Sequence, residues 1–162
     1  FRRVLFRSGA GAGVATCARE LHEAWARCHH FELYDEVPRV FTALARDGVA
    51  IGLISNSHRC LTAFQTHFGL QDVVTATVSS AEQGFLKPHP SIFHAALTRL
   101  RVDARDAVMV GDSIRQDVEG ARGVGMRAVL VHRAADPHPE ASRLATLGVP
   151  IIRSLETVPQ IL

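Results

Sequence analysis

Short apolar runs alternate regularly with amphipathic segments from residue 49 to the end of the chain. The apolar runs cover residues 49–55, 73–80, 106–112, 127–132 and 149–154. Segments with helical periodicity follow them at 58–69, 90–100, 114–125, 139–148 and 155–162. Strands and helices that alternate at this spacing form βαβ units. We therefore expect an α/β fold in which helices cover both faces of a parallel sheet.

The part that precedes this alternation is predicted to be helical. Residues 18–48 read as a helix, a bend near 32–38 and a second helix that ends at Gly48, and a flexible GAGAG stretch stands at 9–13. No apolar run approaches the roughly 20 residues of a membrane span. The three cysteines have no CxxC spacing, which is typical of reduced thiols. We expect a cytoplasmic protein with no membrane partner.

The small positive charge of the chain comes from its first eight residues, FRRVLFRS. Removing Arg2, Arg3 and Arg7 leaves 15 basic against 16 acidic residues, so the net charge changes from +2 to −1. A basic balance that depends on one octapeptide does not favour a nucleic-acid partner.

Polar residues follow three of the predicted strands, and ligands of parallel α/β sheets bind outside the carboxyl ends of strands. The first are Ser55 and Asn56, in the sequence LISNS. A hydroxyl and free backbone N–H groups in front of a helix can hold an anion. The alternative is that Asn56 or Ser57 caps the following helix.

The second is Lys87, the only lysine in the chain, in the sequence GFLKPHPSIF. Pro88 and Pro90 keep this stretch out of a helix and stiffen it. A lysine held there suits a point charge directed at a phosphate or a carboxylate. The alternative is a solvated surface lysine.

The third is the segment GDSIRQDVEGARGVGM, where Gly111 is expected to permit a tight turn. Asp112 ends the strand and Asp117 lies in the first turns of the next helix. Two carboxylates with several waters are a site of the kind that Mg²⁺ uses. The alternative is that Asp112 or Ser113 caps the helix while Asp117 interacts with its positive end.

Taken in this order and spacing, the three motifs resemble those of the haloacid dehalogenase (HAD) superfamily of hydrolases, over about residues 34–162. The resemblance implies a Rossmannoid three-layer fold with a helical cap. It also implies that Ser55, with Asn56 beside it, binds phosphoryl oxygens and that Lys87 neutralises the nucleophile and the phosphoryl group. Asp112 would bind Mg²⁺, and Asp117 would ligate the ion or orient its shell.

The superfamily's nucleophile and its acid/base lie in a DxD motif after the first strand, and this chain contains no DxD. In its place stands VLFRSGAG, where Arg7 and Gly9 take the two aspartate positions. We expect residues 1–8 to be a translated sequencing adapter, residues 9–33 a remnant of the helical cap, and residues 34–162 the hydrolase core without its native first strand. By the resemblance, the first strand lies in the middle of the sheet, between the strands that end at Ser55 and at Val110. We expect segment 2–6, the only spare apolar strand, to occupy that slot.

The resemblance implies a Mg²⁺-dependent phosphatase that acts on a small phosphorylated metabolite through an aspartyl-phosphate. The chain as printed is predicted to be inactive. Two alternatives stay open: a 2-haloacid dehalogenase, and a non-catalytic phosphate-binding protein. Dehalogenating members tend to carry a Ser-Asn pair where this chain has GDS, so Asp112 favours the phosphatase. A phosphoacceptor signalling domain is disfavoured by the cap-like helix and by the order of Ser55, Lys87 and Asp112.

Overall fold

A computed structural model describes residues 16–17, 31–57 and 61–162. The chain divides into two compact units, Phe1–Glu32 and Leu33–Leu162. In the first unit the described residues 16 and 17 are helical, and the rest of the expected cap helix lies outside the described residues. The division at residues 8 and 33 stays a prediction. All that follows concerns the second unit.

The described strands are all paired in parallel, which confirms the predicted α/β class. They form two groups in the order β1-β2 and β3-β4-β5. Their bounds are β1 (Ile51–Ser55), β2 (Val74–Ser79), β3 (Val108–Gly111), β4 (Arg127–Val131) and β5 (Ile151–Ile152).

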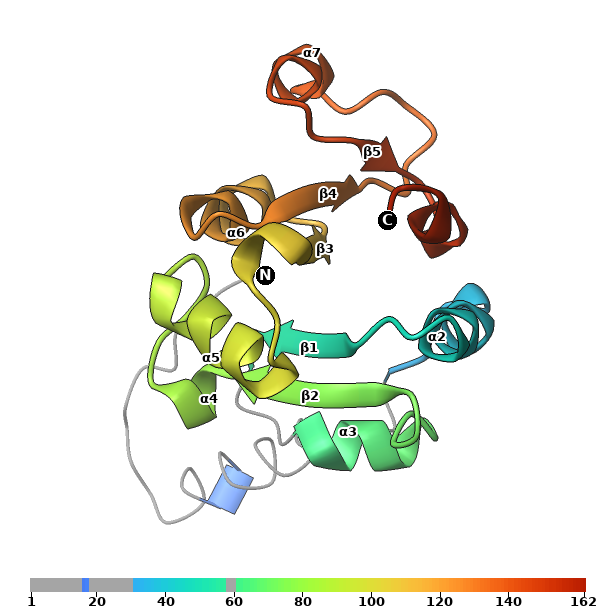
Figure 1. Cartoon of the computed structure of the whole chain (residues 1–162), viewed down its shortest axis with the longest axis vertical. Helices are drawn as coiled ribbons and strands as arrows, with labels where there is room; N and C mark the ends of the chain where they lie inside the picture. The colour runs from blue at the N-terminus through green and yellow to red at the C-terminus, as the bar shows by residue number, and fades with distance from the viewer. Residues whose placement is uncertain (1–15, 18–30, 58–60) are drawn as a thin grey trace. The chain divides into compact units, whose positions relative to one another are not determined.

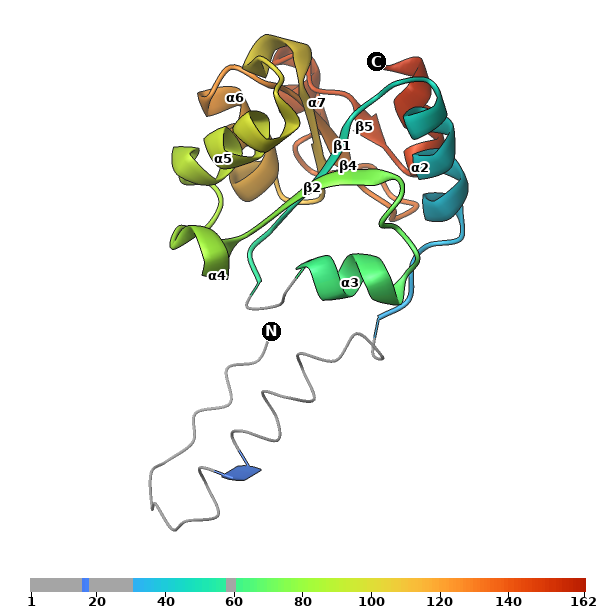
Figure 2. The same cartoon turned by 60° about the horizontal axis from the view of Figure 1, so that its bottom comes forward.

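Helices connect and cover these strands (Figure 1). The α-helices are α2 (Glu36–Arg46), α3 (Leu61–His67), α4 (Ser80–Gln83), α5 (Pro90–Leu100), α6 (Gly120–Gly123) and α7 (Ala141–Thr146). The 3₁₀ segments are η2 (Ala104–Asp106) and η4 (Leu155–Gln160), and η3 (Ile114–Glu119) is a π-helical turn. Helices α5 and α6 lie on one side of the strands, and α2 and η4 lie on the other (Figure 2).

Within the described residues, no strand pairs with the edge of β1 that faces away from β2, or with the edge of β3 that faces away from β4. Both edges stand where the family resemblance puts the missing first strand. The expected placement of segment 2–6 in this slot lies outside the described residues, and it stays a prediction.

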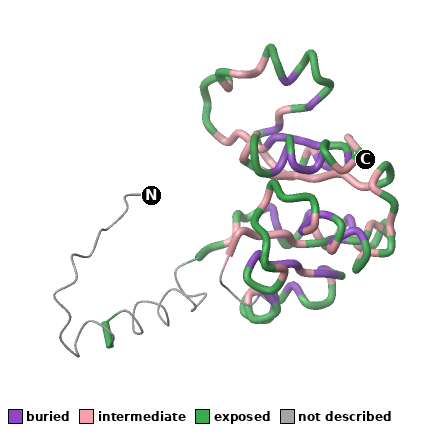
Figure 3. The backbone as a smooth tube through the Cα atoms, turned by 90° about the vertical axis from the view of Figure 1, so that its left-hand side faces the viewer, coloured by how far each residue is buried: buried purple, intermediate pink, exposed green. Residues whose placement is uncertain are grey.

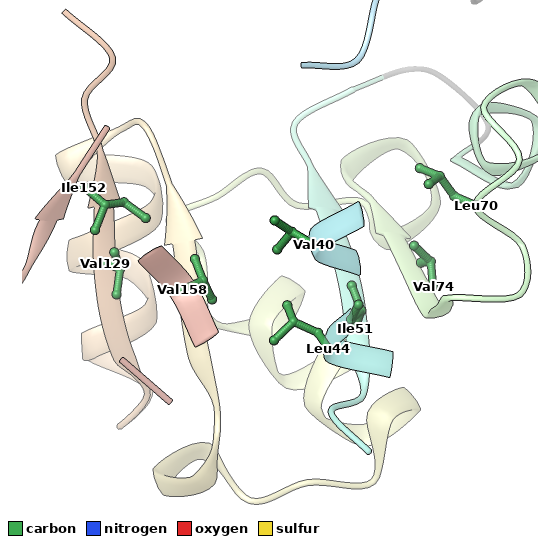
Figure 4. Close-up of a cluster of buried hydrophobic side chains, with 8 residues drawn as sticks. All are labelled: Val40, Leu44, Ile51, Leu70, Val74, Val129, Ile152 and Val158. Carbon is green, nitrogen blue, oxygen red and sulfur yellow. The ribbon is translucent and has the colours of Figure 1, made fainter. Parts of the chain in front are cut away.

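One hydrophobic cluster joins the two strand groups. Val40 and Leu44 of α2 pack together with Ile51 of β1, Val129 of β4 and Val158 of η4. In Figure 4 the two α2 side chains lie between the β1 side and the β4 side of the cluster. Each of these side chains contributes about 1.5–3 kcal/mol by leaving water. Helix α2 therefore packs against both β1 and β4, which belong to separate strand groups.

A second cluster fills the opposite side, where α5 meets α6. Val78, Ile92, Phe93 and Ala121 are fully buried there. A Cβ added at Gly120 would lie 2.6 Å from the Phe93 ring, so this glycine is needed for the close approach of the two helices. In Figure 3 the buried residues gather mainly in the interior of the second unit, and the exposed residues lie mainly along its outer turns.

The structure corrects several expected boundaries. The expected helix at 114–125 is a π-helical turn followed by α6, because the N–H of Val118 bonds to the carbonyl of Ser113, five residues back. Ser80, expected in a strand, opens the short helix α4. The last segment is a 3₁₀ helix that contains Pro159. In the described part of the chain, no helix has the length and apolar character needed to cross a membrane.

Candidate functional site

Side chains from three separate segments meet at the carboxyl end of β1. In Figure 1 this end of β1 lies beside α5. Ser55 ends β1 opposite Ser79 of β2, and Asn56 follows it directly. Lys87 comes from the loop before α5, and Asp117 comes from η3. The structure brings Asn56, Lys87 and Asp117 into direct contact, and it places Ser55 at the end of β1 and Asp112 directly after β3.

Lys87 forms a buried ion pair. Its Nζ lies 2.6 Å from Oδ1 of Asp117, and it donates a second hydrogen bond, of 3.1 Å, to the carbonyl oxygen of Ile54. The side chains of Lys87 and Asp117 are only 10% and 4% exposed. Lys87 is therefore not the solvated surface lysine of the alternative interpretation. Its charge is fixed beside the last residues of β1.

Asp117 uses both of its carboxylate oxygens. Oδ1 pairs with Lys87, and Oδ2 accepts a 3.0 Å hydrogen bond from the backbone N–H of Ser113. This arrangement requires a glycine at position 111, because an added Cβ would lie 2.3 Å from Cγ of Asp117. Gly111 has no positive φ, so the expected tight turn is not the reason for this residue. The reason is the close approach of Asp117 to the end of β3.

Asp112 and Ser113 differ in what they do at the start of η3. The Ser113 hydroxyl accepts the N–H of Gln116 at 3.1 Å and so caps the turn, as the alternative interpretation allowed. Asp112 follows β3 directly and is exposed. A carboxylate at the end of a strand that is not used as a cap is available to a cation.

Asn56 is bound to the Lys87 segment and to η3. Its Oδ1 accepts the backbone N–H of Lys87 at 2.6 Å, and its Nδ2 donates to the carbonyl oxygen of Lys87 at 3.0 Å. The same Nδ2 donates to Oε1 of Gln116 at 3.2 Å. The side chain of Asn56 therefore makes long-range contacts. The alternative that Asn56 or Ser57 caps the following helix depends on residues 58–60, which lie outside the described residues.

Sequence reasoning missed Gln116, the carbonyl of Ile54 and the N–H of Ser113. A glutamine one position before Asp117 carries no signal of its own. Backbone groups are present at every position and cannot be singled out before the fold is known. These partners became visible only through tertiary contacts.

A metal ion at this place would have few protein ligands. Among the described residues, no group of three or more His, Cys, Asp or Glu side chains could hold a metal ion. Asp112 and Asp117 supply hard oxygen donors, which fits an ion that keeps most of its waters. Since both oxygens of Asp117 already have partners, Asp112 is the carboxylate that can bind directly.

The sequence matches the family model for haloacid dehalogenase-like hydrolases over residues 3–125. The chain belongs to this family.

Curated relatives include phosphatases. The phosphoserine phosphatase of Thermus thermophilus is 37% identical over 147 residues, which are 88% of this chain and 59% of that protein. The glyceraldehyde 3-phosphate phosphatase of Pyrococcus abyssi is 34% identical over 61% of this chain and 43% of that protein. The chain thus spans about half the length of the curated relatives that it matches.

Two solved structures share the fold at 29% sequence identity. An HAD phosphatase from Thermococcus onnurineus has a TM-score of 0.73 and covers 89% of this chain and 63% of its own. A 2-haloacid dehalogenase from Pseudomonas syringae has a TM-score of 0.77 and covers 94% of this chain and 64% of its own. These structures confirm the predicted HAD-like Rossmannoid fold.

Proposed function

We propose that the protein to which this chain belongs is a Mg²⁺-dependent phosphatase that acts on a small phosphomonoester. The observation that carries the proposal is the buried Lys87–Asp117 pair, held beside Ser55 at the end of β1. A fixed positive charge in a site with little water interacts strongly with charge that develops on a phosphoryl group. The phosphatases among the relatives support this choice.

Each residue of the site has a proposed part. The Ser55 hydroxyl and the backbone N–H groups after it would bind phosphoryl oxygens. Lys87 would neutralise the negative charge on the phosphoryl group and on the attacking carboxylate. Asp112 would ligate Mg²⁺, whose charge would favour the approach of an anionic substrate. Asp117, which holds Lys87, would orient the ion's water shell.

The nucleophile in this proposal is an aspartate of a DxD motif on a strand between β1 and β3. It would form an aspartyl-phosphate, and the second aspartate would act as general acid and then as base. The sequence has no DxD, so the 162-residue chain by itself is expected to be inactive.

The first experiment is a long-read sequence of the genomic DNA upstream of the Gly9 codon. A reading frame that continues into a DxD motif supplies the longer protein to test. Phosphate release from a panel that includes phosphoserine and glyceraldehyde 3-phosphate is then measured with Mg²⁺ and with EDTA. We expect release that needs Mg²⁺ and is lost in Lys87→Met and in Asp112→Asn.

Two other functions have their own readouts. A 2-haloacid dehalogenase would release chloride from a 2-chloroacid, and the P. syringae structure keeps this function as the second candidate. A genome that encodes FRRVLFRS behind a native start codon would favour a non-catalytic phosphate-binding protein. Full phosphatase activity in both site variants would contradict the assignment of the site.

A further inference from the structure

We propose that Asn56 positions Lys87 and that its side chain does not bind the phosphoryl group. The family resemblance places Asn56 beside Ser55 as a phosphate ligand. The structure directs the side chain of Asn56 elsewhere, towards the main chain of Lys87. The hydrogen bonds of Asn56 stand without the proposed function. The inference rests on that function only where it says why a fixed Lys87 is useful.

The hydrogen-bonding capacity of Asn56 carries the argument. A side-chain amide has two N–H donors and one carbonyl oxygen. Nδ2 uses one donor on the carbonyl of Lys87 and the other on Oε1 of Gln116. Oδ1 accepts the N–H of Lys87. No N–H of this side chain is left for a phosphoryl oxygen, and Oδ1 would repel one.

The two bonds to Lys87 form a clamp on a single residue. One atom of Asn56 holds the N–H of Lys87 and another holds its carbonyl, so the residue is held on both sides of its Cα. The Nζ of the same lysine is held by the carbonyl of Ile54 and by Asp117. The backbone and the charged end of Lys87 are therefore both tied to the end of β1. A lysine has large rotamer freedom, and fixing it in advance removes that cost from the reaction.

Because Lys87 is the only lysine, the clamp can be tested on the 162-residue chain without any activity. Labelling with lysine that carries ¹⁵N and a ¹³C carbonyl gives one amide signal and one carbonyl signal, both from Lys87. The amide reports the bond to Oδ1, and the carbonyl reports the bond to Nδ2. In the unmodified chain we expect a slowly exchanging amide and a hydrogen-bonded carbonyl shift, and absence of both would overturn the proposal.

Variants then separate the two halves of the clamp. In Asn56→Ala the Lys87 amide should exchange at least about tenfold faster, and the carbonyl shift should move. In Asn56→Asp an acceptor remains for the amide while the donor to the carbonyl is lost. The amide should then keep most of its protection, and only the carbonyl shift should move.

A matched control and a reference amide exclude general loosening. Gln116→Ala removes the third contact of Asn56 and should leave the Lys87 amide within about twofold of the unmodified chain. The amide of Met126, bonded to the carbonyl of Ala121, should exchange at the same rate in all variants. Equal acceleration of the Met126 and Lys87 amides would assign Asn56 a general stabilising role and overturn the proposal.

The longer protein gives the catalytic readout. We expect kcat to fall in the order unmodified protein, Asn56→Asp and Asn56→Ala, with a smaller change in KM. An unmodified protein without phosphatase activity would contradict the proposed function and leave the amide measurements intact. An unchanged Lys87 amide in Asn56→Ala would contradict the clamp and leave the phosphatase assay intact.

Discussion

In the described part of the chain, two ion pairs each join a buried carboxylate to a cation, but their surroundings differ. Lys87 and Asp117 meet at the end of β1, within a set of hydrogen bonds from three segments. Glu36 at the start of α2 meets Arg133 after β4 at 2.7 Å, with the guanidinium 3.5 Å from the centroid of the Tyr34 ring. The side chains of Glu36 and Arg133 are 10% and 28% exposed.

The comparison shows that burial of an ion pair alone does not distinguish the candidate site. The Glu36–Arg133 pair attaches α2 to the segment after β4, and Tyr34 covers its cation. The Lys87–Asp117 pair is bonded to Ile54 and Ser113, which are the chain neighbours of the half-buried Ser55 and the exposed Asp112. The Glu36–Arg133 pair therefore stabilises the packing of α2, while the Lys87–Asp117 pair also fixes a positive charge at the candidate site.

The largest expected effect comes from removing one member of the Lys87–Asp117 pair. Asp117→Asn leaves the Lys87 charge buried without its counter-charge, which is expected to lower the free energy of unfolding by about 3–5 kcal/mol. Urea unfolding of the unmodified chain and of Asp117→Asn measures this loss. Lys87→Met combined with Asp117→Asn removes both charges and should recover most of the loss. A single variant as stable as the unmodified chain would mean that the pair is not buried.

Gly111→Ala tests how closely Asp117 approaches β3. The new Cβ would lie 2.3 Å from Cγ of Asp117, so the carboxylate must shift, at an expected cost of about 1–3 kcal/mol in unfolding free energy. Gly123→Ala is the matched control, because nothing lies within 4 Å of its added Cβ. In α6 this control should stabilise the chain by about 0.5–1 kcal/mol. Thermal unfolding of the two variants compares them, and equal melting temperatures would refute the close approach.

Arg133→Met breaks the Glu36–Arg133 pair and should lower the free energy of unfolding by about 1–2 kcal/mol. This loss is smaller than that expected for Asp117→Asn, because Arg133 is more exposed than Lys87. Arg105→Met is the control, since the Arg105 side chain is 80% exposed and its ion pairs should contribute less than about 0.5 kcal/mol. Urea unfolding of both variants gives the comparison. A larger loss in Arg105→Met would reverse the ranking of the two sites.

The smallest expected effect is a pH dependence of the second pair. Burial raises the pKa of Glu36, but hydrogen bonds from its own N–H and from Arg133 outweigh it, so that its pKa lies below the usual 4.5. The folded state then binds fewer protons than the unfolded state, and the stability from Glu36 is present above pH 4.5. This stabilisation is lost as the pH falls through the pKa of Glu36 in the folded state, which lies below its value in the unfolded state.

The difference in unfolding free energy between the unmodified chain and Glu36→Gln measures this contribution. It should be constant near neutral pH and shrink as the pH falls below 4.5. Asp103→Asn serves as the control, because its side chain is 72% exposed. A difference that grows on acidification would give the pKa change of Glu36 the opposite sign.

The sequence by itself determined the order of strands and helices and the three motifs of the site. Apolar runs and helical periodicity are local properties, and they place α5 at the predicted residues 90–100. The motifs could be found because Ser55, Lys87 and Asp112 each follow a predicted strand or precede a helix. Local sequence does not say how the backbone hydrogen bonds of 114–125 divide, so the π-helical turn was missed.

Tertiary structure alone decided how these motifs interact. Asn56 and Lys87 are 31 residues apart, and their bonds depend on the close approach of two loops. The same holds for Gly111, whose role comes from the nearby Asp117 and not from its own backbone angles. Side-chain amides and glycines have many possible uses, and only the neighbours that folding brings to them select one.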